Sequence, residues 1–425
     1  MEFVNFIFGS VTSMSAVEII KMIAMCGLGG LLIYLAIAKD MEPALLLPMG
    51  IGAILVNLPL SGAITQYTVD GVSMTAKAIS ETFFGGAQFT VEEFIHFAQA
   101  NSLTYDVMEG PLNVLFDAGV ANELFPLLLF IGIGAMCDFG PLLSNPKLLL
   151  FGAAAQFGIF MTVIFVCVIG YFFPQTGFTL QDAAAIGIIG AADGPTSIFV
   201  ANYFNTPYMG AILVAAYSYM ALVPIIQPPC IRLITTKKER LIRMPYAKTD
   251  VKKSVRIIFP IAVTIVAGII APLSVGLVGF LMFGNLLREC GVLNNLSDTA
   301  QNALANLITI LLGITVAVKM HASEFLTVPT LIVMGLGLFA FVFDTIGGVM
   351  FAKFLNLFSK DKVNPMIGAC GISAFPMSSR VVHKMGLKED PQNFLLMHAA
   401  GVNVGGQIAS VIAGGLILSI VAKIM

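Results

Sequence analysis

The chain has 425 residues, of which 58% are hydrophobic and only 11% are charged, and its mean hydropathy is +0.93. A soluble domain carries about 25% charged residues, so this chain has too little polar surface to cover an exterior that faces water. The 22 basic and 24 acidic residues leave a net charge of -2, which excludes an electrostatic nucleic-acid binder. Six scattered cysteines form neither a disulfide framework nor a zinc-ligand pattern. The composition predicts an integral membrane protein.

Long apolar runs predict the membrane-spanning helices. The first run has no basic residue before Lys21 and no cleavage site, so we expect it to stay in the protein. A helix needs about 20 apolar residues to cross the hydrocarbon, and runs 125–137 and 365–377 are shorter and contain Gly and Pro. We expect these two to be broken or re-entrant. The runs are 16–38, 44–60, 125–137, 148–173, 183–201, 208–231, 257–287, 304–318, 326–354, 365–377 and 394–424.

Charge divides the chain near its middle. Segment 232–256 holds nine of the 22 basic residues, which predicts a cytoplasmic linker by the positive-inside rule. Segment 61–123 holds eight acidic residues and one basic residue, Lys77, which favours an external polar insertion. The predicted organisation is a first transmembrane half (1–231, including the insertion), the basic linker (232–256) and a second transmembrane half (257–425).

An internal repeat relates the two halves. The stretch from Ile186 to Ser197 matches the stretch from Ile367 to Ser378 at an offset of 181, with five identities in twelve positions. Downstream, an offset of 184 places Tyr219 opposite Asn403. Upstream, segment 125–138 resembles 271–284 at an offset of 146. Matched Gly and Pro breaks in two repeats are the sequence pointer to a central transport site.

The breaks carry oxygen ligands. Gly and Pro that interrupt an apolar helix free N–H and C=O groups, which in hydrocarbon need protein, water or an ion as partner. Oxygen ligands suit a hard cation such as Na⁺, and the carboxylate of Asp193 would offset the charge of the ion. The candidate residues at and beside the breaks are Asp193, Thr196, Ser197, Asn364, Ser373, Ser378, Ser379, Arg380 and Asn403.

Several of these residues also have a structural alternative that the sequence leaves open. Asp193 could cap the start of a helix, and the serines could let helices approach closely. Tyr219 could be a buried phenol with a hydrogen-bond partner, and Arg380 could end its segment and reach the surface. Asp138 and Asp344 lie at segment ends or near glycines, where they either contribute to an ion path or reach water.

Motifs of soluble enzymes are missing from the chain. It has no G-x-x-x-x-G-K-[ST], G-x-S-x-G or H-E-x-x-H motif, which excludes a P-loop pump with its motor in this chain. Lys319 and Met320 end an apolar run and do not form a biotin attachment site. Any cofactor would therefore come with a partner.

Three stretches carry a resemblance to a known family. They are AAAIGIIGAADGPTSIF at 183–199, AAYSYMALVPIIQPP at 215–229 and QNFLLMH at 392–398. The chain resembles the beta subunit of the sodium-pumping, biotin-dependent decarboxylases, which act on oxaloacetate, methylmalonyl-CoA, glutaconyl-CoA or malonate. The resemblance covers essentially the whole chain, including FIGIGAMCDFGPLL at 130–143. It implies an all-α membrane protein, a polytopic bundle of two related, inverted repeats with discontinuous or re-entrant helices.

The resemblance implies both an activity and the residues that perform it. In that family the beta subunit decarboxylates carboxybiotin carried by a partner while it exports Na⁺ and takes up a proton. Asp193 would be the central Na⁺ and proton ligand, Tyr219 the proton donor or relay to biotin, and Ser373 a second ion ligand that also shuttles a proton. Four further residues match positions that the family uses in the ion path or near the carboxybiotin: Asn364, Gly368, Arg380 and Asn403.

We expect Arg380 to bind the carboxybiotin and to take part in catalysis. Asn364 and Asn403 would contact both cofactor and ion, and Gly368 would contact the ion. The implied cofactors are transported Na⁺ and biotin, attached to a partner subunit as carboxybiotin. The implied partners are a biotin-carrier and carboxyltransferase (alpha) subunit, a small single-span gamma or delta subunit, membrane lipid and further copies of this chain. No nucleic-acid partner is expected.

The resemblance places the chain in the bacterial cytoplasmic (inner) membrane as a multi-pass protein. The alternative function is a Na⁺-coupled secondary carboxylate transporter without biotin chemistry, which would share the paired breaks. A non-catalytic membrane anchor is disfavoured, because an anchor has no use for Asp193 or for two matched breaks.

Overall fold

The computed structural model describes residues 15–59, 61–74, 76–85, 89–245, 251–374 and 376–424. Residues 246–250 of the predicted linker lie outside the described residues. The side chain of Lys77, in the predicted polar insertion, also lies outside them. The chain folds into two compact units. Unit 1 comprises residues 1–122 and 310–328, and unit 2 comprises residues 123–309 and 329–425.

Seven helices in the described part of the chain are long and apolar enough to cross a membrane, or eight if 111–121 and 124–136 count as one span. This confirms the predicted polytopic helical membrane protein. The inverted relation of the halves and the boundaries of the linker stay predictions. The seven spans are Ala16–Lys39, Leu148–Phe172, Met209–Ile234, Lys253–Ile270, Asn294–Met320, Val328–Phe358 and Leu396–Ile424.

Unit 1 combines a helix pair with a small sheet. A capping box of Ser15 and Glu18 starts α2, and α2 packs on α3 where Gly29 and Gly50 face one another. A Cβ on either glycine would lie 2.7 Å from the carbonyl oxygen of the other. The helices are α2 (Ala16–Lys39), α3 (Pro43–Asn57), α4 (Ala76–Phe83), α5 (Val91–Ala100), α6 (Pro111–Phe116), η1 (Asp117–Ala121), η6 (Ala317–Met320) and α19 (Ala322–Phe325).

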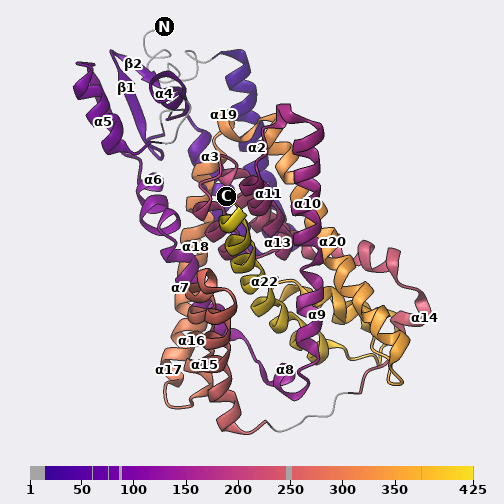
Figure 1. Ribbon diagram of the computed structural model, residues 1–425. Coiled ribbons are helices and arrows are strands. Elements are labelled where there is room, and N and C mark those ends of the chain that lie inside the picture. The colour runs from indigo at the N-terminus through magenta and orange to yellow at the C-terminus, as the bar shows by residue number, and fades with distance from the viewer. Residues whose placement is uncertain are drawn as a thin grey trace. The chain divides into compact units, whose positions relative to one another are not determined.

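The predicted polar insertion contains the sheet of unit 1. Strands β1 (Gln66–Val69), β2 (Val72–Met74) and β3 (Tyr105–Met108) form an antiparallel sheet in the order β2-β1-β3. Helices α4 and α5 lie beside the sheet (Figure 1). Tyr67 and Phe94 are the centre of an aromatic core between sheet and helices. The insertion is therefore a folded subdomain.

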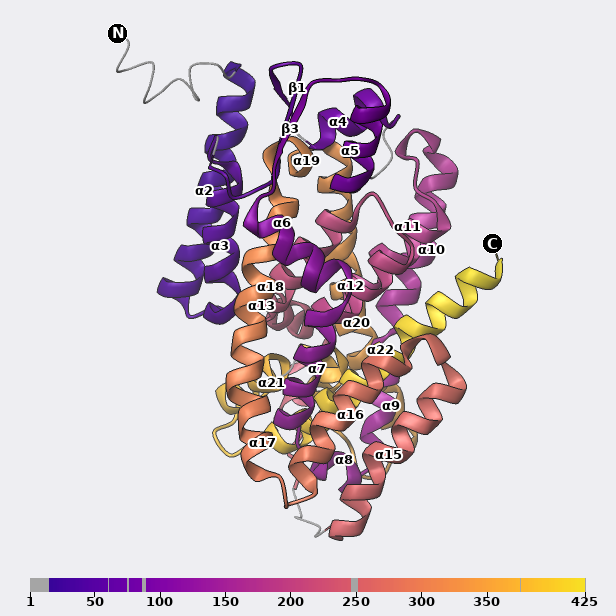
Figure 2. The same cartoon turned by 90° about the vertical axis from the view of Figure 1, so that its left-hand side faces the viewer.

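Unit 2 contains the two breaks of the sequence repeat, which lie within 186–197 and 367–378. Helix α18 (Ala305–Val316) begins in this unit, and α7 and α16 lie side by side in it (Figure 2). Its other helices are α7 (Leu124–Met136), α8 (Gly140–Ser144), α9 (Leu148–Ala155), α10 (Phe157–Phe172), η2 (Pro174–Thr176), α11 (Leu180–Gly187), η3 (Ile188–Ala191), α12 (Gly194–Tyr203), α13 (Met209–Ile234), α14 (Lys237–Arg240), α15 (Lys253–Ile270), η4 (Pro272–Ser274), α16 (Val275–Glu289), α17 (Asn294–Asp298), η5 (Thr299–Leu304), α20 (Val328–Phe358), η7 (Pro365–Gly371), α21 (Met377–Glu389) and α22 (Leu396–Ile424).

The packing of α7 on α16 is reciprocal. A Cβ on Gly134 would lie 1.9 Å from the carbonyl oxygen of Leu281, and a Cβ on Gly284 would lie 2.0 Å from that of Ile131. Only glycine permits so close a backbone approach, the usual role of small residues between membrane helices. The two contacts join residues that are 147 and 153 positions apart, whereas the sequence alignment of this region has an offset of 146.

Candidate functional site

The first break presents the carboxylate of Asp193. Ala192 adopts a left-handed backbone (φ 50°) and Asp193 is extended (φ -126°, ψ 96°), so the chain leaves η3 before it enters α12. Asp193 is 3% exposed and caps α12. Its Oδ1 accepts from the N–H of Thr196 at 3.3 Å, and its Oδ2 accepts from the Thr196 hydroxyl at 2.7 Å. The helix cap that the sequence left open is therefore present.

The second break follows η7. Every residue from Pro365 to Gly371 is buried, and the backbone is extended at Ile372 before α21 begins at Met377. This run was predicted to be broken, and the structure has a short 3-10 segment there in place of a span. Its main-chain groups are therefore free to bind other segments.

The two breaks meet at a main-chain hydrogen bond. The N–H of Ser373 donates to the carbonyl of Ala191 at 2.9 Å. The Ser373 hydroxyl forms a short hydrogen bond with the Ser410 hydroxyl, which itself lies 3.4 Å from Oδ2 of Asp193. Asp193 and Ser373, both predicted ion ligands, are thus linked through a third oxygen.

Helix α22 holds the second break with three polar side chains. The Asn403 amide donates to the carbonyls of Ile372 at 2.7 Å and Cys370 at 3.2 Å, and the Gln407 amide donates to the carbonyl of Ser373. Residues 403, 407 and 410 share one helix face because they are four and three positions apart. Asn403 therefore reaches the second break alongside Gln407 and Ser410.

Acceptor oxygens are left over around these amides. Within the described residues, Asn403 Oδ1 and Gln407 Oε1 are buried without a hydrogen-bond donor, although the amide nitrogens of both side chains are bound. A buried unsatisfied polar group costs about 1–3 kcal/mol. A cation would remove that cost, and hydroxyl, amide and carboxylate oxygens are the ligands of hard cations. These oxygen atoms are therefore suitable ligands for Na⁺.

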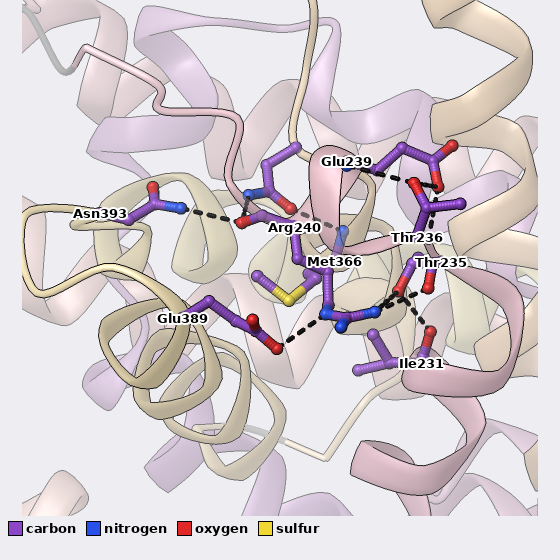
Figure 3. Close-up of polar contacts among 9 residues, drawn as sticks. Ile231, Thr235, Thr236, Glu239, Arg240, Met366, Glu389 and Asn393 are labelled. Carbon is purple, nitrogen blue, oxygen red and sulfur yellow. Dashed lines mark hydrogen bonds and ion pairs between the residues drawn. The ribbon is translucent and has the colours of Figure 1, made fainter.

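Asn364 contacts the linker and the start of η7. Its amide nitrogen donates to the carbonyls of Arg240 at 2.9 Å and Ile242 at 2.8 Å, and its Oδ1 accepts from the N–H of Met366. Figure 3 shows the Arg240 guanidinium between Glu389, at 2.8 Å, and the Thr235 carbonyl. The hydrogen bonds of Asn364 thus go to the linker and η7 and not to Asp193 or Ser373.

The short helix α14 fixes the linker further. Thr236 and Glu239 form a capping box at its start, and Lys353 of α20 pairs with Glu239 at 3.2 Å. Burial opposes ionisation of Glu239, but hydrogen bonds from Thr236 and Lys353 outweigh it and lower the pKa of this carboxyl. The start of the basic linker is therefore tied to α20 and α21.

Two tyrosines of α13 lie in different surroundings. The hydroxyl of Tyr219, the predicted proton donor, donates to the carbonyl of Met334 at 2.5 Å. Tyr217 packs on the first break, since a Cβ on Gly194 would lie 2.2 Å from its ring. The Tyr217 hydroxyl is buried with no hydrogen-bond partner among the described residues. The phenol next to Asp193 is therefore Tyr217, which the sequence did not single out.

Arg380 and Gly368 complete the predicted set. Arg380 lies in the first turn of α21, is exposed, and forms no ion pair within the described residues. Gly368 lies against α20, because a Cβ there would be 2.1 Å from the carbonyl oxygen of Gly348. Asp138, weighed as an ion-path residue, accepts from the N–H of Gly140 and lies 3.9 Å from Arg288.

The sequence missed Ser410, Gln407 and Tyr217. The first two lie in an uninterrupted apolar run, so no break marked them. Their spacing from Asn403 was a usable signal, because polar residues four and seven positions on share its helix face.

Comparison with known proteins gives one consistent result. A family model described as the Na⁺-transporting oxaloacetate decarboxylase beta subunit matches residues 21–421. The chain is 48% identical over 403 residues to the methylmalonyl-CoA decarboxylase subunit beta of Propionigenium modestum, covering 95% of this chain and 94% of that one. It is 46% identical over 406 residues to the oxaloacetate decarboxylase beta chain of Klebsiella pneumoniae, covering 92% and 93%.

Proposed function

Because the chain belongs to the Na⁺-transporting oxaloacetate decarboxylase beta subunit family, we propose that it decarboxylates carboxybiotin carried by a partner subunit. This reaction drives Na⁺ export and consumes a proton from outside. The partners would be a biotin-carrier and carboxyltransferase (alpha) subunit and a small single-span gamma or delta subunit. The location would be the bacterial cytoplasmic membrane. Family, membrane-spanning helices and Na⁺-coupled decarboxylase function agree with the predictions from the sequence.

The meeting of two helix breaks around a buried carboxylate carries this proposal. Asp193 would hold Na⁺ together with the hydroxyls of Thr196, Ser373 and Ser410. A carboxylate in hydrocarbon is costly unless a cation or proton neutralises it, so the two compete for Asp193. Binding of one then expels the other, which is the exchange that the function requires. Asn403, Asn364 and Gly368 remain proposed members of the ion path, and the last two also position η7.

Decarboxylation of carboxybiotin needs a positively charged side chain and a proton relay. Carboxybiotin supplies an N-carboxyl group that leaves as CO₂ and a ring nitrogen that accepts a proton. The guanidinium of Arg380 is exposed and forms no ion pair with the residues that the structure describes, so it suits the carboxylate of that group. Tyr219 would pass a proton only after its hydrogen bond to Met334 opens. We therefore assign binding to Arg380 and relay to Tyr219.

The test compares two buried aspartates in the isolated complex. Asp193→Asn is expected to abolish Na⁺-dependent decarboxylation and uptake of radioactive Na⁺ into vesicles while the complex still assembles. Asp182→Asn is the matched control, because Asp182 is equally buried at 3% exposure, but both of its carboxylate oxygens accept hydrogen bonds from Thr179 and Thr206 at the start of α11. Unchanged turnover in Asp193→Asn would refute the ion site.

A separate test addresses the biotin partner. The complex would be purified in mild detergent and its subunits probed with labelled streptavidin. A biotinylated subunit is expected. An intact complex without biotin would favour the secondary transporter instead.

A further inference from the structure

Asp344 is a further buried acid of unit 2, besides Asp182 and Asp193, and it is not one of the ligands assigned to Na⁺. It lies within α20 and has no exposed surface, so it does not reach water as the sequence allowed. Its Oδ1 accepts from the N–H of Ile159 at 3.0 Å, and the N–H of Gly158 also bonds to it. Asp344 thus binds the free N–H groups where α9 ends and α10 begins.

The second oxygen of Asp344 points at the first break. Oδ2 has no hydrogen-bond partner among the described residues. A Cβ on Gly190 would lie 2.7 Å from this oxygen, and a Cβ on Gly158 would lie 2.5 Å from Oδ1. The carboxyl is therefore enclosed between two glycines, and Gly190 is three residues before Asp193 in the chain.

Within the part of the chain that the structure describes, no charged side chain pairs with Asp344. The groups that face it from α10, η3 and α20 are main-chain groups and Ala340, and only the two N–H groups of α10 favour its ionised form. The titratable groups on α10 and α20 are Cys167, Tyr171 and Lys353. Those on the segments beside η3 are Asp182, Asp193, Tyr203, Tyr217, Tyr219, Cys230 and Arg232, and none of these groups bonds to Asp344 within the described residues. An acid in hydrocarbon whose second oxygen lacks a donor favours its proton-bound form.

Asp182 shows how a purely structural acid looks in the same unit. One of its oxygens accepts from the N–H and hydroxyl of Thr179, and the other accepts from the Thr206 hydroxyl at 2.5 Å. Both oxygens are satisfied. Asp344 differs because one oxygen is satisfied and the other is not.

The corresponding place in the second half needs no acid. Gly371 aligns with Gly190 in the repeat. A Cβ on Gly371 would lie 2.5 Å from the side chain of Ala155, whereas a Cβ on Gly190 would lie 2.7 Å from Oδ2 of Asp344. The neighbouring Gln156 donates to the carbonyl of Gly371 at 3.2 Å. An alanine and a neutral amide thus suffice for this packing, so packing alone does not explain an acid at 344.

We propose that Asp344 is a second proton-binding carboxyl of the transport machinery, which takes a proton on Oδ2 and releases it when Na⁺ occupies Asp193. The proposal rests on the proposed function. Oδ2 of Asp344 faces Gly190, three residues before Asp193 in the chain. Two carboxylates within one buried, low-dielectric region repel, so an ionised, empty Asp193 favours a proton on Asp344. Na⁺ neutralises Asp193 and removes that repulsion. Asp344 then ionises, held by the N–H groups of α10.

Infrared difference spectroscopy of the purified complex tests this directly. A protonated carboxyl has a C=O band that disappears when the proton leaves. In wild-type complex this band is expected to shrink as pH rises at constant K⁺, and again when Na⁺ replaces K⁺. Asp344→Asn should remove the band, whereas Asp182→Asn should leave both responses unchanged. Where Asp344→Asn does not assemble, Asp344→Glu keeps the acid and should shift the band.

Two results would overturn the proposal. One is that no band sensitive to substitution of Asp344 changes with pH. The other is that the intensity of such a band stays the same when Na⁺ replaces K⁺, in a complex whose turnover still requires Na⁺. Failure of the proposed function looks different, because there Asp193→Asn keeps Na⁺-dependent turnover whatever the spectra show.

Discussion

Ser410→Ala would measure how strongly the third oxygen between the two breaks contributes to Na⁺ binding. Its hydroxyl contacts the Ser373 hydroxyl, lies 3.4 Å from Asp193 Oδ2, and bonds the carbonyl of Gln407 at 3.1 Å. A hydrogen bond to a charged group contributes about 1.5–3 kcal/mol. Since 1.4 kcal/mol is about a factor of ten, we expect the Na⁺ concentration for half-maximal decarboxylation to rise about 10- to 100-fold.

The assay is the initial rate of decarboxylation by the isolated complex against Na⁺ concentration. Ser419→Ala is the matched control, because Ser419 lies on the same helix and, among the described residues, its hydroxyl bonds only the carbonyl of Gly415, at 2.8 Å. The maximal rate should change less than the half-maximal concentration. A half-maximal Na⁺ concentration equal to that of the control would refute the assignment of Ser410 to the ion site.

Two further predictions concern packing and pH. Gly368→Ala would place a methyl group 2.1 Å from the carbonyl oxygen of Gly348, so we expect the free energy of unfolding to fall by about 1–3 kcal/mol and the thermal midpoint to fall with it. Gly335→Ala is the control, because a Cβ there meets nothing within 4 Å, and its midpoint should not fall. Equal midpoints in the two variants would contradict this packing. Burial raises the pKa of Tyr67 to about 12, so the stability it contributes is complete below pH about 10 and is lost as pH rises through about 12. Tyr67→Phe should remove one late-ionising phenol from the ultraviolet titration, and loss of a phenol that ionises near pH 10 would contradict it.

The sequence predicted those features that have local signals. Gly and Pro within apolar runs mark the breaks, because they interrupt helical hydrogen bonding wherever they occur. The repeat then related the two breaks, and Asp193 stood out because an acid in an apolar run is costly. The structure places Asp193 and Ser373 on either side of Ser410, at one site.

Other features depend on three-dimensional contacts that no spacing specifies. Asn364 lies beside the second break in the chain, yet its amide binds the linker at residues more than a hundred positions away. Tyr217 and Tyr219 are two residues apart on α13, and only the packed structure shows that Tyr217 meets Gly194. The pairing of β1 with β3 joins residues about forty positions apart, and the short strands have little pattern to set a register.

The direct hydrogen bond between the two breaks joins main-chain atoms. The N–H of Ser373 and the carbonyl of Ala191 are present whatever side chains those positions carry. The side chains around the two breaks, Thr196 and Ser410 among them, can therefore be substituted without removing this hydrogen bond. Proline at 373 is the exception, because it has no N–H to donate.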